Sequence, residues 1–183
     1  MAVKMIEAAL NGVTLLEPTV FDDERGSFYE SYNERTFRDL TGFDGRFVQD
    51  NHSTSLRNVL RGIHYQLPNP QGKLVRCIDG EIWDVAVDLR RGSPTFSHWR
   101  GYRLTSANRF QLWLPVGFGH GFVVLSNHAQ VLYRTTEFWD PKCERVISWD
   151  DTSLAIEWPI NEPPLLSARD ASAPSLGDVA LFD

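Results

Sequence analysis

Short apolar segments separated by turn residues run along most of the chain, and this pattern predicts a protein built mainly of β-strands. The expected strands are residues 13–21, 27–32, 74–78, 81–89, 111–115, 121–125, 129–139, 147–149 and 155–158. The pair Asp79-Gly80 separates the third strand from the fourth and favours a type I′ turn, so these two strands are predicted to form a β-hairpin. Many short strands with little helix indicate a sandwich or a barrel.

One short helix is expected after the second strand. Asn33 is a suitable N-cap, Phe37 and Leu40 share a face, and Gly42 follows the last turn. The segment after Pro163 has no clear period and is predicted to be irregular. The 183 residues suffice for one domain with its own core and are too few for two ordinary ones, so residues 1–183 are expected to form a single domain.

The composition is that of a folded protein and restricts its partners. Hydrophobic residues make up 42% of the chain and charged residues 23%, which argues against disorder. The net charge of −6 gives no basis for a nucleic-acid surface, and no apolar run approaches the length of a membrane span. Residues 1–10 carry no signal-peptide pattern, so Cys77 and Cys143 are expected to be reduced thiols in a cytoplasmic protein.

Two features narrow the barrel to a jelly roll of the cupin type. Residues 115–121 read Pro-Val-Gly-Phe-Gly-His-Gly and resemble the second cupin motif, Pro-x-Gly-x-x-His, and Gly80 follows a hairpin strand that comes after a histidine-bearing strand. Many cupins bind a metal through a His-x-His pair on that earlier strand, but this chain has His64-Tyr65-Gln66 with the cationic Lys73 nearby. Because a metal of this kind needs imidazole, carboxylate or thiolate ligands, no metal site is expected.

Several polar residues on or next to strand-like segments could act on one ligand. They are Gln49, Asp50, Asn51, Arg61, His64, Lys73, His120 and Tyr133. Alternation along residues 129–139 puts Tyr133 and Trp139 on one face. An imidazole, an ammonium group and a phenol suit proton removal next to a carbonyl, because they can take the proton, stabilise the enolate and return a proton from the other side. Such chemistry requires no cofactor.

The residues alone leave other interpretations open. A single histidine or tyrosine on a strand is more often a structural residue with its hydrogen bonds satisfied. Arg25 beside an acidic cluster could form only an exposed ion pair. Strict alternation places Arg61 and His64 on opposite faces, unless Gly62 introduces a β-bulge between them. Without further information the pattern supports a barrel with a polar pocket.

The motifs together resemble the dTDP-4-dehydrorhamnose 3,5-epimerase family of the rhamnose pathway. The resemblance extends from about Val13 to Asp170 and includes Tyr133. The matching stretches are residues 21–26 (FDDERG), 47–53 (FVQDNHS), 59–66 (VLRGIHYQ), 71–76 (QGKLVR), 84–90 (DVAVDLR), 93–96 (SPTF), 111–122 (QLWLPVGFGHGF), 149–151 (WDD) and 166–170 (LSARD).

The resemblance implies a cofactor-independent epimerase that inverts C3 and C5 of dTDP-4-dehydro-6-deoxy-D-glucose and gives dTDP-4-dehydro-L-rhamnose, a step toward L-rhamnose for cell-surface polysaccharides. It implies His64 as general base and Asp170 as its carboxylate partner. Tyr133 is then the general acid, and Lys73 lies at the keto oxygen. The other residues implied to bind the nucleotide sugar are Arg25, Glu30, Gln49, Asp50, Asn51, Arg61, His120, Trp139, Glu144 and Arg169.

The same resemblance implies a homodimer in which the N-terminal strands cross to the neighbouring subunit. Arg25 and Glu30 are then expected to complete the site of the partner. Trp139 stands where the family usually stacks a tyrosine or phenylalanine on thymine, and Arg169 replaces a usual lysine. An indole still stacks and a guanidinium is still a cation, so no implied catalytic group is lost.

Three other functions remain open. An epimerase that inverts only C3 or only C5 of a dTDP-4-keto-6-deoxysugar, in a deoxysugar or antibiotic pathway, would use the same residues. A metal-dependent cupin enzyme would need the histidine that Gln66 replaces, and a metal analysis would test it. A non-catalytic sugar-nucleotide binding protein would be expected to lack His64, Tyr133 or Asp170, all of which are present.

Overall fold

The computed structural model describes residues 3–183, so the first two residues of the predicted domain lie outside it. The described chain consists mainly of β-strands, with two short α-helices and one 3-10 helix. The strands are β1 (Val3–Ala9), β2 (Val13–Pro18), β3 (Val20–Asp23), β4 (Gly26–Tyr29), β5 (Gln49–Leu56), β6 (Leu60–Gln66), β7 (Lys73–Asp79), β8 (Glu81–Asp88), β9 (Trp99–Thr105), β10 (Gln111–Leu114), β11 (Phe118–Val124), β12 (His128–Thr135) and β13 (Glu144–Val146). The helices are α1 (Glu34–Thr41), α2 (Ala168–Ala171) and η1 (Leu176–Asp178). The predicted all-β class with one or two short helices is confirmed.

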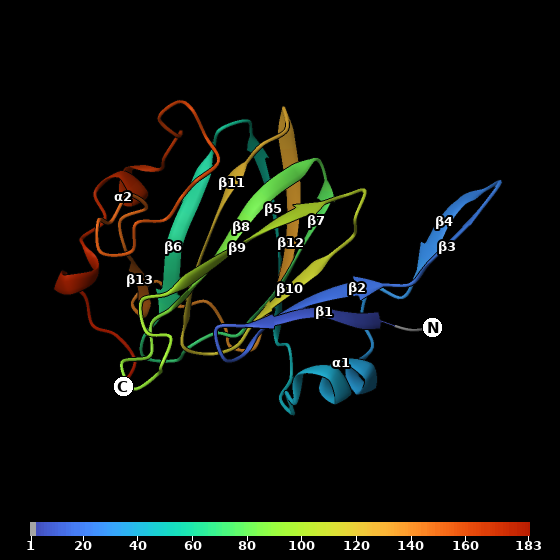
Figure 1. The fold of residues 1–183 in the computed structure, drawn as a ribbon, viewed down its shortest axis with the longest axis horizontal. Coiled ribbons are helices and arrows are strands. Elements are labelled where there is room, and N and C mark those ends of the chain that lie inside the picture. The colour runs from blue at the N-terminus through green and yellow to red at the C-terminus, as the bar shows by residue number, and fades with distance from the viewer. Residues whose placement is uncertain (1–2) are drawn as a thin grey trace.

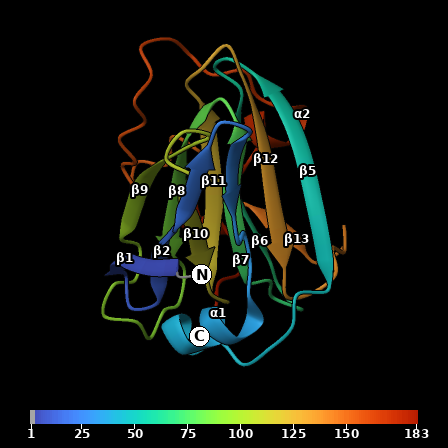
Figure 2. The same ribbon diagram turned by 90° about the vertical axis from the view of Figure 1, so that its right-hand side faces the viewer.

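Two antiparallel sheets form the body of the molecule and face each other (Figures 1 and 2). The six-stranded sheet has the order β1-β2-β10-β7-β12-β5, and the five-stranded sheet has the order β13-β6-β11-β8-β9. From β5 to β13 the chain changes sheet at every connection except the one between β8 and β9. This arrangement confirms the expected jelly roll, although the two sheets have open edges and do not close into one continuous ladder.

The predicted hairpin at Asp79-Gly80 is wrong, because β7 and β8 belong to different sheets. Gly80 has a φ of +77°, and a Cβ atom there would collide with the carbonyl oxygen of His128, so the turn is tight as its sequence indicates. The turn, however, directs the chain across the core instead of back along its own sheet. Val75 and Ile82 both point into the core between the sheets, so the two strands bury apolar side chains by facing each other.

The predicted strand 13–21 is divided in two. Pro18 ends β2 and has no N–H group to continue the ladder, so the chain leaves the six-stranded sheet there. Residues 20–29 then form the β3–β4 hairpin, which is a separate two-stranded sheet extending away from the body (Figure 1). Phe21 and Phe28 on this hairpin are 50% and 62% exposed.

The strands predicted at 147–149 and 155–158 are also absent from the described chain, where these residues are irregular. Their large apolar side chains are nevertheless buried or half-buried, because Ile147, Ile156 and Trp158 pack in the cluster on the outer face of the five-stranded sheet. Burial alone therefore produced a pattern typical of strands. The segment after Pro163, predicted to be irregular, contains the short helices α2 and η1.

Apolar side chains fill three layers. The main core lies between the sheets and includes Val75 and Leu112. A second cluster around Ile63 lies on the outer face of the five-stranded sheet, where the C-terminal segment covers it. The third lies on the outer face of the six-stranded sheet, where Phe37 of α1 packs edge-on against Trp113 at a ring distance of 5.2 Å.

Helix α1 begins and ends where the sequence predicts. The side-chain oxygen of Asn33 accepts a hydrogen bond from the Thr36 N–H at 3.2 Å, and the Gly42 N–H donates to the carbonyl of Arg38 at 2.8 Å. No helix among residues 3–183 is long and apolar enough to cross a membrane.

A buried carboxylate at the end of β8 stabilises the fold. Asp88 is fully buried and accepts hydrogen bonds from Arg90 at 2.7 Å, Ser93 at 2.5 Å and Thr95 at 2.6 Å. Burial alone would raise the pKa of Asp88, but these hydrogen bonds outweigh it and lower the pKa to about 2. Folding therefore depends on the ionised form of this residue.

We expect Asp88→Asn to lower the free energy of unfolding by about 3 kcal/mol at pH 7, because the Arg90 charge is left without its partner. Urea denaturation measures this change. The folded pKa lies below the unfolded value of about 3.9, so the stabilisation is present above pH 4 and is lost as the pH falls toward 2. The difference between the two proteins should therefore shrink in acid. Asp44→Asn, in an exposed ion pair, is the control and should have no measurable effect.

Candidate active site

A polar cavity of about 320 Å³ lies between the two sheets. The six-stranded sheet contributes residues of β5, β7 and β12, and the five-stranded sheet contributes residues of β6, β11 and β13. We call it the inter-sheet cavity. Its lining residues are Gln49, Asn51, Ser53, Arg61, His64, Gln71, Lys73, His120, Phe122, Tyr133, Trp139 and Glu144.

A β-bulge at Gly62 brings Arg61 and His64 to the same cavity. In the pairing of β6 with β11, His64 lies opposite His120 and Arg61 lies opposite Phe122, so one residue is inserted on β6. Gly62 has a φ of +119°, and a Cβ atom on it would lie 2.5 Å from the Cα of Gly121. Only glycine fits here. The β-bulge that Arg61 and His64 need in order to share a face is therefore present.

His64 is paired with a buried carboxylate. Its Nε2–H donates to Asp170 at 2.6 Å, and Asp170, on α2, is 3% exposed. Burial would raise the pKa of Asp170, but the hydrogen bonds from His64, Ser167 and the Gly62 amide lower it below its usual range. An ionised Asp170 fixes the proton of the neutral imidazole on Nε2, which leaves Nδ1 as its basic nitrogen.

Lys73 is buried at the start of β7, next to His64. Its Nζ donates to the main-chain carbonyl of His64 at 3.3 Å, and the residue is 8% exposed. Burial lowers the pKa of Lys73 to about 8, although Glu144 and Asp84 oppose the shift. The ammonium group therefore carries a positive charge at neutral pH in a place where little water screens it.

Tyr133 enters the cavity from the opposite sheet to His64. Alternation along β12 turns Tyr133 inward, while its neighbour Arg134 lines a groove on the outer face. Burial raises the pKa of the Tyr133 phenol, with Arg61 opposing the shift and Glu144 adding to it. The phenol is therefore protonated at neutral pH and can act as an acid.

A second histidine–carboxylate pair lies beside the first. His120 Nε2 is 3.0 Å and 2.9 Å from the two oxygens of Asp84, a residue with no exposed surface. Asp84 is not among the site residues predicted from the sequence, and no role was predicted for Ser53, Gln71 or Phe122, which also line the cavity. The available signal for Asp84 was a carboxylate within the otherwise apolar run of β8, because such a group needs a buried partner.

Trp139 lines the cavity although the strand that was predicted to carry it ends earlier. Strand β12 stops at Thr135, so the expected alternation does not extend to Trp139. The main-chain N–H of Trp139 instead donates to the side-chain oxygen of Gln49 at 3.0 Å. The side-chain amide of Gln49 in turn donates to the side-chain oxygen of Asn51 at 2.8 Å. Trp139 is 53% exposed and forms part of the mouth of the cavity.

Four predicted binding residues do not line the inter-sheet cavity. Arg25 pairs with Asp23 at the exposed tip of the β3–β4 hairpin, and Glu30 accepts a hydrogen bond from the capping residue Asn33. Arg169 lies next to the cavity and pairs with Glu144, which does line it. The fourth is Asp50.

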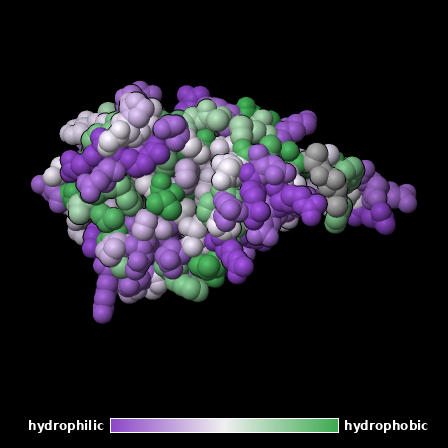
Figure 3. Space-filling model, turned by 90° about the horizontal axis from the view of Figure 1, so that it is seen from below, coloured by the Kyte–Doolittle hydropathy of each residue, from purple (hydrophilic) through white to green (hydrophobic). Residues whose placement is uncertain are grey.

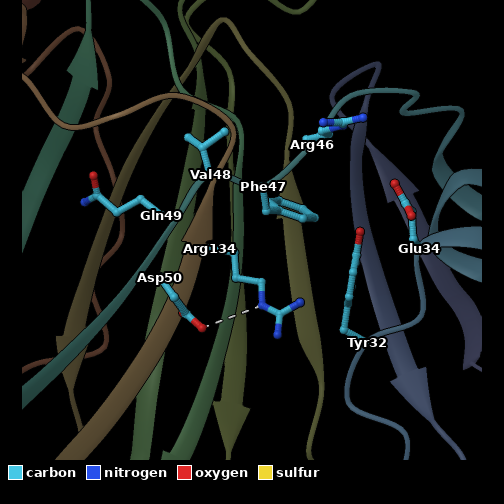
Figure 4. Close-up of a pocket in the computed structure, with 8 residues that line it drawn as sticks. All are labelled: Tyr32, Glu34, Arg46, Phe47, Val48, Gln49, Asp50 and Arg134. Atoms are coloured by element: carbon cyan, nitrogen blue, oxygen red, sulfur yellow. Dashed lines mark ion pairs between the residues drawn. The ribbon is translucent and has the colours of Figure 1, made fainter.

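Asp50 points to the opposite face of β5 from Gln49 and Asn51. There it lies 3.7 Å from Arg134, in a second groove of about 590 Å³ on the outer side of the sheet (Figure 4). The guanidinium of Arg134 also lies 4.5 Å over the ring of Tyr32. We call the groove that contains Asp50 and Arg134 the edge groove. Gln49 lines both the edge groove and the inter-sheet cavity.

Cys77 and Cys143 are both buried free thiols, as predicted. Over residues 3–183, no group of three His, Cys, Asp or Glu side chains is arranged to hold a metal ion.

Comparison with known proteins identifies the family. Residues 7–178 match the family model of dTDP-4-dehydrorhamnose 3,5-epimerase. The chain is 54% identical over 179 residues to the dTDP-4-dehydrorhamnose 3,5-epimerase of Pseudomonas aeruginosa, covering 98% of this chain and 99% of that protein. It is 53% identical over 180 residues to that of Salmonella typhimurium, covering 98% of each.

Solved structures agree with the sequence relatives. The crystal structure of dTDP-6-deoxy-D-glucose-3,5-epimerase from Legionella pneumophila, in complex with dTDP-4-keto-L-rhamnose, matches with a TM-score of 0.96 and 44% sequence identity over 99% of this chain and 98% of that one. The resemblance based on motifs is confirmed: the chain is an isomerase that belongs to the dTDP-4-dehydrorhamnose 3,5-epimerase family.

Proposed function

We propose that the chain inverts C3 and C5 of dTDP-4-dehydro-6-deoxy-D-glucose to give dTDP-4-dehydro-L-rhamnose. The observation that carries the proposal is the opposed arrangement of His64 and Tyr133, which line one cavity from different sheets. A proton removed from one side of a carbon and replaced from the other inverts that carbon. The buried ammonium of Lys73 beside them is suited to the negative charge that forms in between.

One of the two half-reactions takes place at C3, next to the C4 ketone. Nδ1 of His64 accepts the C3 proton, and the electron pair of that C–H bond moves to form an enolate on O4. Asp170 holds the Nε2 proton and stabilises the imidazolium. Lys73 stabilises the enolate oxygen, and Tyr133 then donates its phenol proton to the other face of C3. Imidazolium and phenolate return to their starting forms by proton exchange with solvent.

The same groups serve C5, which lies on the other side of the ketone. Proton removal there places negative charge on the same oxygen, so one cation suffices for both steps. A change of sugar ring pose between the two steps presents the second carbon to His64 in place of the first. Proton transfer by positioned side chains accounts for about 10²- to 10⁴-fold of the rate at each step.

The nucleotide part of the substrate is assigned to the mouth of the cavity. Ser55 accepts a hydrogen bond from Arg61 Nε at 3.0 Å and so fixes a guanidinium for the diphosphate, with His120 nearby. The exposed indole of Trp139 offers a flat surface for the base. The amides of Gln49 and Asn51 and the Arg169–Glu144 pair provide polar contacts around it.

We further propose a homodimer with exchanged N-terminal strands. The β3–β4 hairpin extends from the body with a hydrophilic tip (Figures 1 and 3), and its two phenylalanines are at least half exposed. Burial against a second copy would remove this apolar surface from water. Arg25 and Glu30 lie outside the cavity of their own chain, and the hairpin would carry them to the partner's cavity.

Proton NMR of dTDP-4-dehydro-6-deoxy-D-glucose in deuterated water with a chelator tests the function. Deuterium at both C3 and C5, together with an L-sugar trapped by a downstream reductase, is the expected result. Exchange at one carbon would replace the proposal by a single-centre epimerase, and exchange at neither would overturn it. Light scattering in the same buffer tests the dimer, which a monomeric mass would exclude.

The lowered pKa of Lys73 predicts how the reaction depends on pH. Because the ammonium form exists below about pH 8, we expect kcat/KM to fall as the pH rises through this value. Initial rates between pH 6 and pH 10 measure the profile. Lys73→Arg stays charged over this range, so whatever activity it retains should not fall near pH 8. A wild-type profile that stays flat to pH 9.5 would show that the charge on Lys73 is not used.

A further inference from the structure

Gln66 is a buried amide with an unusual number of bonds to other segments. It follows His64 by two residues on β6 and is 2% exposed. Its Nε2 donates to the carbonyl of Asn69 at 2.8 Å and to that of Phe138 at 3.1 Å, while its Oε1 accepts from the Asp140 N–H at 2.8 Å. Both donor hydrogens and one acceptor position are therefore engaged, so truncating this side chain leaves buried main-chain groups without partners.

These bonds fix the backbone on both sides of Trp139. Gln66 holds Phe138 and Asp140, while Gln49 accepts from the N–H of Trp139 itself. The indole is 53% exposed, so packing alone does not determine its position. The backbone of residues 138–140, which lies beyond the end of β12, is thus held by two glutamine side chains.

The other end of this segment is tied to the same strand. Glu144 on β13 pairs with Gln66 in the five-stranded sheet, and the Leu67 N–H donates to the carbonyl of Cys143 at 2.9 Å. Gln66 and His64 share one strand and are separated by a single residue. The element that carries the proposed base therefore also determines where the indole lies.

We infer that Gln66 is a positioning residue for nucleotide recognition. It determines where the Trp139 indole lies relative to His64. The inference rests on the proposed function, in which the indole stacks on the base of the substrate. Stacking is made equally in the ground state and the transition state, so its loss weakens binding without slowing the chemical step. Gln66 thus contributes to KM, whereas its neighbour His64 contributes to kcat.

Gln66→Met tests this inference, because methionine has a similar length and no amide. We expect the Kd for dTDP and the KM for the nucleotide sugar to rise about tenfold, the size of one lost stacking contact, while kcat stays within about threefold. Gln66→Asn, which keeps the amide on a stem one methylene shorter, should give a smaller loss of affinity. Gln130→Met makes the same change on β12, where the glutamine bonds to His52 and Asp79, and should leave Kd and KM unchanged.

A double-mutant cycle separates positioning from general support of the fold. In a Trp139→Ala background the indole is gone, so Gln66→Met should change the Kd for dTDP less than about twofold. An equal loss of affinity with and without Trp139, or a loss in kcat at constant KM, would overturn the inference. If Gln66→Met unfolds in thermal melts, the cycle is run with Gln66→Asn.

The outcomes also separate this inference from the proposed function. Coupling between Gln66 and Trp139 in dTDP binding, in a wild-type protein that exchanges no sugar protons, would overturn the epimerase proposal and leave the positioning role standing. Normal epimerisation with additive effects of the two substitutions would overturn the positioning role alone. A wild-type protein that does not bind dTDP would overturn both.

Discussion

Replacing His64 by asparagine should reduce deuterium exchange at both C3 and C5 by about 10³-fold or more. Asparagine is close to histidine in size and keeps a polar group toward Asp170, but it cannot accept a proton at neutral pH. Both carbons should be affected alike, because the mechanism gives them one base. Time-resolved proton NMR in deuterated water measures the loss at each carbon separately.

His52→Asn is the matched control for this experiment. His52 is an exposed residue of β5 and bonds to Gln130 on the outer face of the sheet, so its replacement should not change the exchange rate. Asp170→Asn should give an intermediate loss, because the base remains but its tautomer is no longer fixed. If His64→Asn exchanges either proton at a near-normal rate, a different residue is the base at that carbon.

Tyr133→Phe should separate proton removal from inversion. The substitution removes only the phenol oxygen, so His64 still takes the proton and the enolate still forms. Without an acid on the opposite face, the proton returns from the side it left, and inversion should fall by about 10²-fold or more while exchange continues. Comparing deuterium incorporation with the yield of L-sugar measures the two processes in one sample.

Tyr65→Phe makes the same chemical change one residue away from His64. Tyr65 points to the other face of β6, where its hydroxyl donates to the carbonyl of Ala180 at 2.6 Å in the outer cluster. Its loss should lower stability slightly and should leave both exchange and inversion intact. A Tyr133→Phe protein that still inverts both centres would show that the acid lies elsewhere.

Much of the fold could be predicted because local signals and tertiary packing agree over most of the chain. The cap at Asn33 and the alternation along β12 are local properties that the structure retains. The hairpin at Asp79-Gly80 failed because a two-residue turn determines the reversal of the chain and does not determine which strand becomes the neighbour. That choice depends on burial against strands far away in the sequence.

For the site, too, the local features could be predicted from the sequence and the contacts between distant segments could not. Gly62 allowed a bulge, and the register of β6 against β11 realises it, which places Arg61 and His64 at one cavity. The partners that come from distant segments were harder to find. Asp170 could be named only through the family motif, and Asp84 and Gln66 were not assigned their contacts, because a buried polar residue indicates the need for a partner and not the partner's identity.

The repeated change of sheet along the chain also affects how activity is acquired during folding. His64 and Tyr133 lie on strands whose nearest neighbours in the sequence belong to the opposite sheet, so β6 and β12 each pair with strands that are not next to them in the chain. Pairing of this kind is slow, because long loops must close before the contacts form. A single sheet, even if formed, contains only one of the two proton-transfer groups. The proposed base and acid therefore meet only when both sheets are complete, so we expect activity to return with the last step of folding.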